Sequence, residues 1–143
     1  MRYLGLDLGT KTLGVAITDE TKTLARILKV IRFPEYDYES ACEELLKILA
    51  EFDIESIALG LPKNMNNTMG FASERSLNFK KLLEEKTDIP IFLIDERLST
   101  VEAESILINS DTSRSKRKKI IDGLAAVLIL EIFMAQKENK NEQ

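Results

Sequence analysis

Two apolar runs at the start of the chain, Tyr3–Leu8 and Thr12–Thr18, are separated only by Gly9-Thr10-Lys11. So short a polar link predicts an antiparallel hairpin. Because side chains alternate along a strand, Asp7 is expected on the opposite face from the leucines beside it. A carboxylate on an apolar strand costs free energy unless it is paired, hydrated or bound to a metal. Asp7 is therefore a candidate functional residue, and the alternative is an aspartate that caps a turn.

The rest of the chain alternates between extended and helical patterns. We expect a third strand at Thr23–Phe33, helices at Tyr38–Phe52, Phe71–Lys86, Leu98–Asn109 and Lys116–Gln136, and short buried strands at Ser56–Gly60 and Ile91–Ile94. This order predicts an α/β fold of the ribonuclease H-like arrangement. Its five-stranded mixed sheet has three antiparallel strands, then parallel strands, with helices on both faces.

The length of 143 residues fits one domain, which we place at residues 1–136, with a flexible tail at residues 137–143. No apolar run approaches the ~20 residues of a membrane span, and no secretory leader is apparent. The single cysteine, Cys42, excludes a disulfide framework within the chain. These features predict a cytoplasmic protein without a membrane partner.

The chain contains no histidine. This excludes Ser-His-Asp and Cys-His catalysis and any zinc site with histidine ligands. Chemistry in this chain must therefore use carboxylates, lysines, hydroxyls and hard metal ions.

Three acids occupy positions that such a fold would bring to one edge of the sheet. Asp7 lies on the first strand, Glu96 just past the last strand, and Asp122 within an otherwise apolar helix. Together they suit Mg²⁺ or Mn²⁺, and two such ions about 3.5–4 Å apart can activate water and stabilise a leaving phosphodiester oxygen. The alternatives are a Glu96 paired with Arg97 and an Asp122 favoured by the helix dipole.

A basic segment precedes the last helix, in a polar link that we expect over Asp111–Lys119. Such a run is often only a solvated surface, but beside a carboxylate metal site it would bind phosphates and weaken with salt. Arg97 could position either Glu96 or a phosphate. The candidate nucleic-acid-binding residues are Lys11, Lys63, Arg97, Arg114, Lys116, Arg117, Lys118 and Lys119.

At four blocks the sequence resembles the YqgF family, also called RuvX, described as Holliday junction resolvases and as pre-16S rRNA nucleases. The blocks are Asp7–Ala16; Gly60-Leu-Pro with Asn66, Thr68 and Gly70; Asp95–Thr100 with Glu102-Ala103-Glu104; and Asp122–Leu130. The resemblance covers nearly the whole chain. Gly123 departs from it, since the family often has serine there.

The resemblance implies a ribonuclease H-like fold and a divalent-metal nuclease site at Asp7, Glu96 and Asp122. It also implies a role in maturing the 5′ end of 16S rRNA in the bacterial cytoplasm. The expected partners are structured RNA (pre-16S rRNA) or branched DNA, bound by a monomer or a homodimer.

Other functions stay open at this point. A Holliday junction resolvase and a non-catalytic nucleic-acid-binding module are compatible with the same fold. An ATPase of the actin and sugar kinase type shares an Asp-x-Gly-Thr hairpin, but it needs a second lobe for which 143 residues leave no room.

Overall fold

The computed structural model describes residues 1–61, 71–95 and 114–141, and within these it describes only the backbone at 71–72, 114–122 and 138–141. The elements are β1 (Arg2–Leu8), β2 (Thr12–Thr18), β3 (Ala25–Arg32), α1 (Tyr38–Glu51), β4 (Ile54–Leu61), α2 (Phe71–Glu84), β5 (Ile91–Asp95) and α4 (Arg114–Asn141). The helix predicted at Leu98–Asn109 lies outside the described residues.

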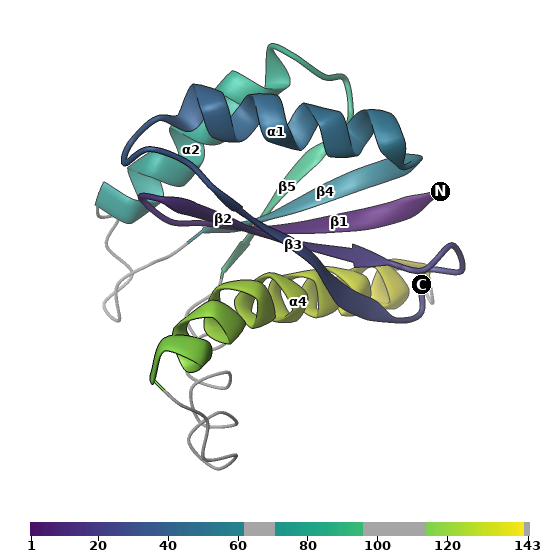
Figure 1. Ribbon diagram of the computed structural model, residues 1–143. Helices are drawn as coiled ribbons and strands as arrows, with labels where there is room; N and C mark the ends of the chain where they lie inside the picture. Colours follow the sequence, from purple (N-terminus) through teal and green to yellow (C-terminus); the bar gives the residue numbers. More distant parts are fainter. Residues whose placement is uncertain (62–70, 96–113, 142–143) are drawn as a thin grey trace.

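The five strands form one sheet in the order β3-β2-β1-β4-β5. β1 pairs antiparallel with β2, and β2 with β3, while β4 pairs parallel with both β1 and β5. Helices α1 and α2 cover one face of the sheet and α4 covers the other (Figure 1). The predicted mixed sheet of the ribonuclease H-like arrangement is confirmed.

The hairpin residues divide between two cores, one on each face of the sheet. Leu4, Leu6 and Leu8 pack in the cluster that includes α1 and α2, whereas Tyr3 packs in the cluster that includes α4. Asp7 lies four residues after Tyr3. Because alternate side chains of a strand point to the same face, Asp7 also belongs to the face covered by α4. The predicted separation of Asp7 from the leucines is therefore confirmed.

Helix α1 shows how local sequence fixes one layer. Asp37 caps it by accepting the Ser40 backbone N–H at 3.3 Å. Ala41, Leu45 and Ile48 follow at helical spacing and are buried against the sheet.

Helix α4 differs from its predicted extent at both ends. It begins at Arg114, two residues before the predicted start at Lys116, so the basic residues 114–119 are helical and the polar link predicted over Asp111–Lys119 ends earlier than expected. Arginine and lysine are good helix formers, and a run of them does not end a helix. At the other end the helix continues to Asn141, past the predicted end at Gln136.

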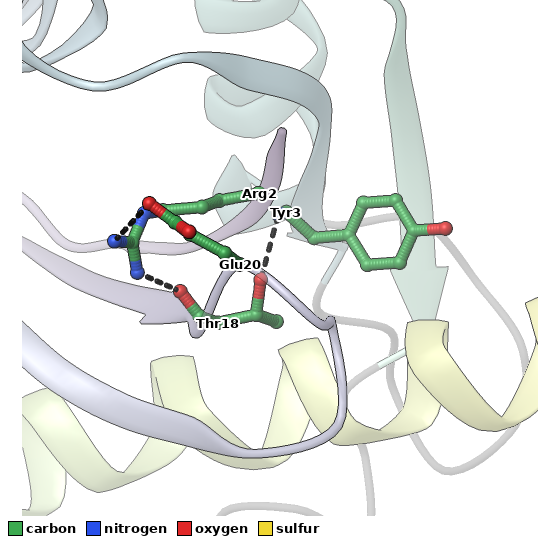
Figure 2. Close-up of polar contacts among 4 residues, drawn as sticks. All are labelled: Arg2, Tyr3, Thr18 and Glu20. Carbon is green, nitrogen blue, oxygen red and sulfur yellow. Dashed lines mark hydrogen bonds and ion pairs between the residues drawn. The ribbon is translucent and has the colours of Figure 1, made fainter.

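Polar contacts fix the amino end of β1 against the end of β2 (Figure 2). The Tyr3 backbone N–H donates to the buried Thr18 hydroxyl at 2.9 Å, and the Arg2 guanidinium donates to the Thr18 carbonyl at 3.0 Å. Arg2 also lies 3.6 Å from the Glu20 carboxylate. These contacts fix the register of β1 against β2. The same register places Gly14 opposite Asp7 further along the hairpin.

Candidate active site

Asp7 is partly buried on β1 and pairs directly with Gly14 on β2. On the other side, β1 and β4 are in register up to Leu6 and Leu59, so one further step brings Gly60 beside Asp7. Gly60 pairs in turn with Ile94 on β5. At the level of Asp7, neither neighbouring strand contributes a side chain, and the carboxylate is bordered by glycine on both sides.

Helix α4 runs antiparallel to β1 on the same face. The Tyr3 and Phe133 rings meet edge to face with centroids 5.1 Å apart. Two residues further along β1, a Cβ built on Gly5 would stand 2.7 Å from both the Ala126 carbonyl oxygen and Leu130 Cβ. Successive positions toward the carboxyl end of β1 therefore meet earlier turns of α4.

Asp122 lies on α4, four residues before Ala126. Four residues make about one helical turn, so Asp122 lies near the stripe of α4 that contacts β1. The structure describes its backbone but not its side chain. The next residue, Gly123, is buried against β3, where a Cβ would come 3.0 Å from Ile27 Cδ1.

Glu96, Arg97 and Lys63 lie outside the described residues. The last described residue before Glu96 is the exposed Asp95, which ends β5 and pairs with Leu61. Within the part of the chain that the structure describes, no three acids or cysteines are grouped as metal ligands. The predicted convergence of the three acids therefore stays a prediction.

The predicted phosphate-binding residues fall into two described groups. Lys11, in the β1–β2 turn, lies 3.4 Å from Glu35, and both side chains are well exposed. An exposed ion pair of this kind contributes little stability, so a phosphate can compete for the lysine. The basic segment at 114–119 forms the start of α4, whose first turn carries no acid.

Sequence reasoning missed the part that Gly60 plays beside Asp7. The residue was noted only as the end of a buried strand and as part of a motif. The position of Gly60 beside Asp7 follows from the parallel register of β1 and β4, which cannot be derived from a single sequence.

Charged contacts also gather at the opposite end of β1. There a hydrogen bond from Lys22, at 3.0 Å, is the main cause that lowers the pKa of Glu55, and burial raises the pKa of the Tyr3 phenol. Lys22 also lies 5.1 Å from the centre of the Tyr3 ring. Ion pairs therefore mark this end of the strand, while glycines on the two neighbouring strands flank Asp7 at the other end.

Comparisons with known proteins agree with this architecture. A model of the RuvX family, described as "Holliday junction resolvase", matches residues 1–136. A protein of Geobacillus sp. (strain WCH70) named "Putative pre-16S rRNA nuclease" is 48% identical over 138 residues, which cover 96% of this chain and 100% of that protein. The protein of the same name from Bacillus subtilis (strain 168) is 47% identical over 134 residues, covering 94% and 97%.

Two solved structures share the fold. RuvC of T. thermophilus in complex with a Holliday junction substrate superposes with a TM-score of 0.60 at 15% identity, covering 96% of each chain. The fowlpox virus resolvase in complex with Holliday junction DNA gives 0.56 at 13% identity, covering 95% of this chain and 98% of that one. No helix among the described residues is long and apolar enough to cross a membrane.

Proposed function

The chain belongs to the RuvX family of Holliday junction resolvases, and from this premise we propose that it is a nuclease that hydrolyses phosphodiester bonds with the help of a divalent metal ion. Its curated relatives, at 47–48% identity over nearly their whole length, carry a name that assigns them to pre-16S rRNA. We therefore propose the 5′ end of precursor 16S rRNA as the substrate, cut in the cytoplasm by a single domain of residues 1–136.

The position of Asp7 carries this proposal. An acid on a central strand, with glycine on both neighbouring strands, has no side chain of those strands beside it, and we propose that a hydrated ion and a phosphate use the room this leaves. A residue with a side chain at position 14 or 60 would narrow that room. The arrangement suits metal binding better than a turn-capping role, because Asp7 lies within β1 and not in the turn.

The register of α4 on β1 supports Asp122 as a second ligand. The step from Gly5 to Asp7 covers about 6.6 Å along the strand, and the step from Ala126 back to Asp122 covers about 6 Å along the helix. Since Ala126 meets Gly5 and the two elements run antiparallel, the Asp122 backbone lies near the level of Asp7.

Strand alternation supports Glu96 as the third ligand. Ile94 packs in the core beneath α4, on the same face as Asp7. Two residues later along an extended chain, Glu96 would point to that face also, just beyond the end of β5.

The donor set fits a hard cation. Carboxylate oxygens from Asp7, Glu96 and Asp122 are ligands that Mg²⁺ and Mn²⁺ prefer, and the chain has no histidine that would favour zinc. We propose that these three residues hold one ion or a pair of ions. When bound, such ions activate a water molecule and stabilise the leaving oxygen of the phosphodiester.

The protein's own cations would then position the substrate. Arg114, Lys116, Arg117, Lys118 and Lys119 form the first turns of α4, where the helix dipole adds positive potential to their charge. We propose that this segment, with Lys11, Lys63 and Arg97, binds phosphates next to the one that is cut. Asp122 follows Lys118 by one helical turn, so metal ligand and phosphate-binding residues are neighbours on one helix.

A second candidate function is the resolution of Holliday junctions, which the family description favours. A resolvase that nicks two strands symmetrically needs a two-fold dimer, whereas processing of one RNA strand can be done by a monomer. Sedimentation of the pure protein, with and without nucleic acid, separates these two states.

The proposal is tested by a cleavage assay in Mn²⁺ with two labelled substrates. One is a 16S precursor fragment with its 5′ extension, and the other is a four-way DNA junction. We expect the wild type to cut the RNA, Asp7→Asn to fold normally without cutting, and the exposed control Asp53→Asn to cut as the wild type does. Cutting of the junction alone would favour the resolvase, and full activity of Asp7→Asn would end the assignment of the site.

A further inference from the structure

Strand β3 carries three cations and no acid. Arg26, Lys29 and Arg32 are all exposed, and none of them is in an ion pair with another residue that the structure describes. They stand out in a chain whose formal net charge is −4. A local excess of positive charge on an acidic protein indicates attraction for a polyanion.

β3 is the outermost strand on its side of the sheet, and it is nearest the viewer in Figure 1. Its pairing with β2 shifts between Val15 and Ala16, which leaves Leu28 as an extra residue in a bulge. Bulges and cations both discourage the addition of another strand to a sheet edge. A second protein strand is therefore an unsuitable occupant of this edge.

Acids line the side of the strand that faces α1. Glu43 and Glu44 of α1 line a groove of about 280 Å³ together with Lys29 and Arg32. Glu44 is itself engaged by Lys47 at 2.9 Å. A further acid, Asp19, accepts the Leu24 backbone N–H at 3.4 Å just before the strand.

Two exposed apolar side chains extend the surface. Leu24, just before the strand, is 72% exposed, and Ile27 is 42% exposed. Ile27 rests against Gly123, the residue after Asp122. The surface of β3 is thus continuous with the part of α4 that holds the proposed metal ligand.

The length of the strand matches a run of phosphates. From Arg26 to Arg32 an extended chain covers about 20 Å, with cations at intervals of about 10 Å. A nucleic-acid strand places one phosphate every ~3.4 Å along a duplex, so this length meets several of them.

We propose that β3 is a second nucleic-acid-binding surface, on which Arg26, Lys29 and Arg32 bind the phosphates of substrate that flanks the cut. Ile27 adds apolar surface on the α4 side of the strand, whereas Lys29 lies on the α1 side with Ile31, so the bound strand would cross the edge of the sheet between the two faces. This surface is separate from the basic segment at the start of α4, and the proposal rests on the proposed nuclease function.

The test is a salt series of binding measurements in EDTA, so that no cleavage occurs, with the 5′-extended 16S precursor fragment as probe. The variant is R26Q/K29Q/R32Q, and the matched control is K80Q/K81Q/K86Q, which removes the same charge from the end of α2 and the residues after it. With ~0.7 counterions released per single-strand phosphate, we expect the slope of log K against log salt to fall by about 2 in the β3 variant only. If the two proteins bind equally at 1 M salt, the β3 variant therefore binds roughly 100-fold more weakly than the wild type at 0.1 M salt.

Two further readouts keep the result interpretable. Melting curves confirm that both variants fold, and single-turnover cleavage at saturating RNA should stay near the wild-type rate in the β3 variant. An unchanged slope would overturn the proposal. The three cations would then serve only to prevent pairing of this sheet edge with another strand, and the variant should self-associate. A wild type that binds with the full slope but cuts nothing would refute the nuclease function alone.

Discussion

Asp7 on β1 lies directly opposite Gly14 on β2, in the register of the hairpin that begins the chain. Directly opposed residues in an antiparallel pair have Cβ positions about 4.5–5.5 Å apart on the same face. Any side chain at position 14 would therefore stand beside the carboxylate. Because glycine weakens a strand interior, we attribute Gly14 to the proposed site and not to the strand.

We expect Gly14→Val to abolish cleavage and the stabilisation by Mn²⁺, because the branched side chain would occupy the space beside Asp7. Valine favours extended structure, so the strand itself should tolerate the substitution. The measurement is the melting temperature with and without millimolar Mn²⁺, together with cleavage. A Gly14→Val protein that folds and keeps both properties would show that the space beside Asp7 is not used.

Gly5→Ala should be far more harmful than Gly123→Ala. At Gly5 the new Cβ would lie 2.7 Å from a backbone oxygen of α4, so the helix must move away from β1 at a cost of about 1–3 kcal/mol. At Gly123 the new Cβ would lie 3.0–3.2 Å from three carbons of the exposed Ile27 side chain, which can shift toward solvent, and the change should stay within about 1 kcal/mol. Urea unfolding measures both, and equal costs would contradict the close packing of α4 on β1.

Gly5→Ala should also reduce cleavage at temperatures where the protein is folded. A displaced α4 would carry Asp122 away from Asp7, so the loss should appear in the single-turnover rate at saturating RNA. A Gly5→Ala protein that is destabilised but cuts at the wild-type rate would refute the link between this packing and the site.

Thr18→Val tests the polar contacts at the far end of the hairpin. The substitution keeps the shape but leaves the buried Tyr3 N–H without its acceptor, which should lower the free energy of unfolding by about 1–3 kcal/mol. Thr18→Ser keeps the oxygen and should cost about 0.8 kcal/mol for the lost methyl group. A valine variant as stable as the wild type would mean that the hydrogen bond contributes nothing.

The β2–β3 turn should respond to acid through Asp19. Its pKa is lowered to about 2, chiefly by the hydrogen bond it accepts from the Thr23 backbone N–H. Because the folded pKa is depressed, its stabilising effect is complete above the ordinary value of 3.8 and is lost as the pH falls toward about 2. The gap in melting temperature between wild type and Asp19→Asn should narrow from pH 6 to pH 2.5, and a constant gap would contradict this role.

Much of the fold follows from local pattern in the sequence. Alternation placed Asp7 and Leu6 on opposite faces, and the short Gly9-Thr10-Lys11 link predicted the hairpin; both are confirmed. The ends of elements are predicted less accurately: the sequence predicts the last helix from Lys116, whereas α4 begins at Arg114, because lysine and arginine are compatible with a helix.

The surroundings of the site could be predicted only in part. Gly60 beside Asp7 and Ile27 against Gly123 depend on strand register and on helix-to-sheet packing, which join residues distant in the chain. The roles of Asp7, Glu96 and Asp122 remain predictions, which rest on the family pattern and on the course of β1, β5 and α4.

The most direct test of the account is the melting temperature of wild type, Asp7→Asn, Glu96→Gln and Asp122→Asn, each with and without millimolar Mn²⁺. If the three acids surround one metal site, Mn²⁺ should raise the melting temperature of the wild type, and each variant should lose most of that rise. Without metal, each variant should be at least as stable as the wild type, because removal of one charge relieves repulsion among the three. A wild type indifferent to Mn²⁺, or three variants that keep the full rise, would contradict the shared site.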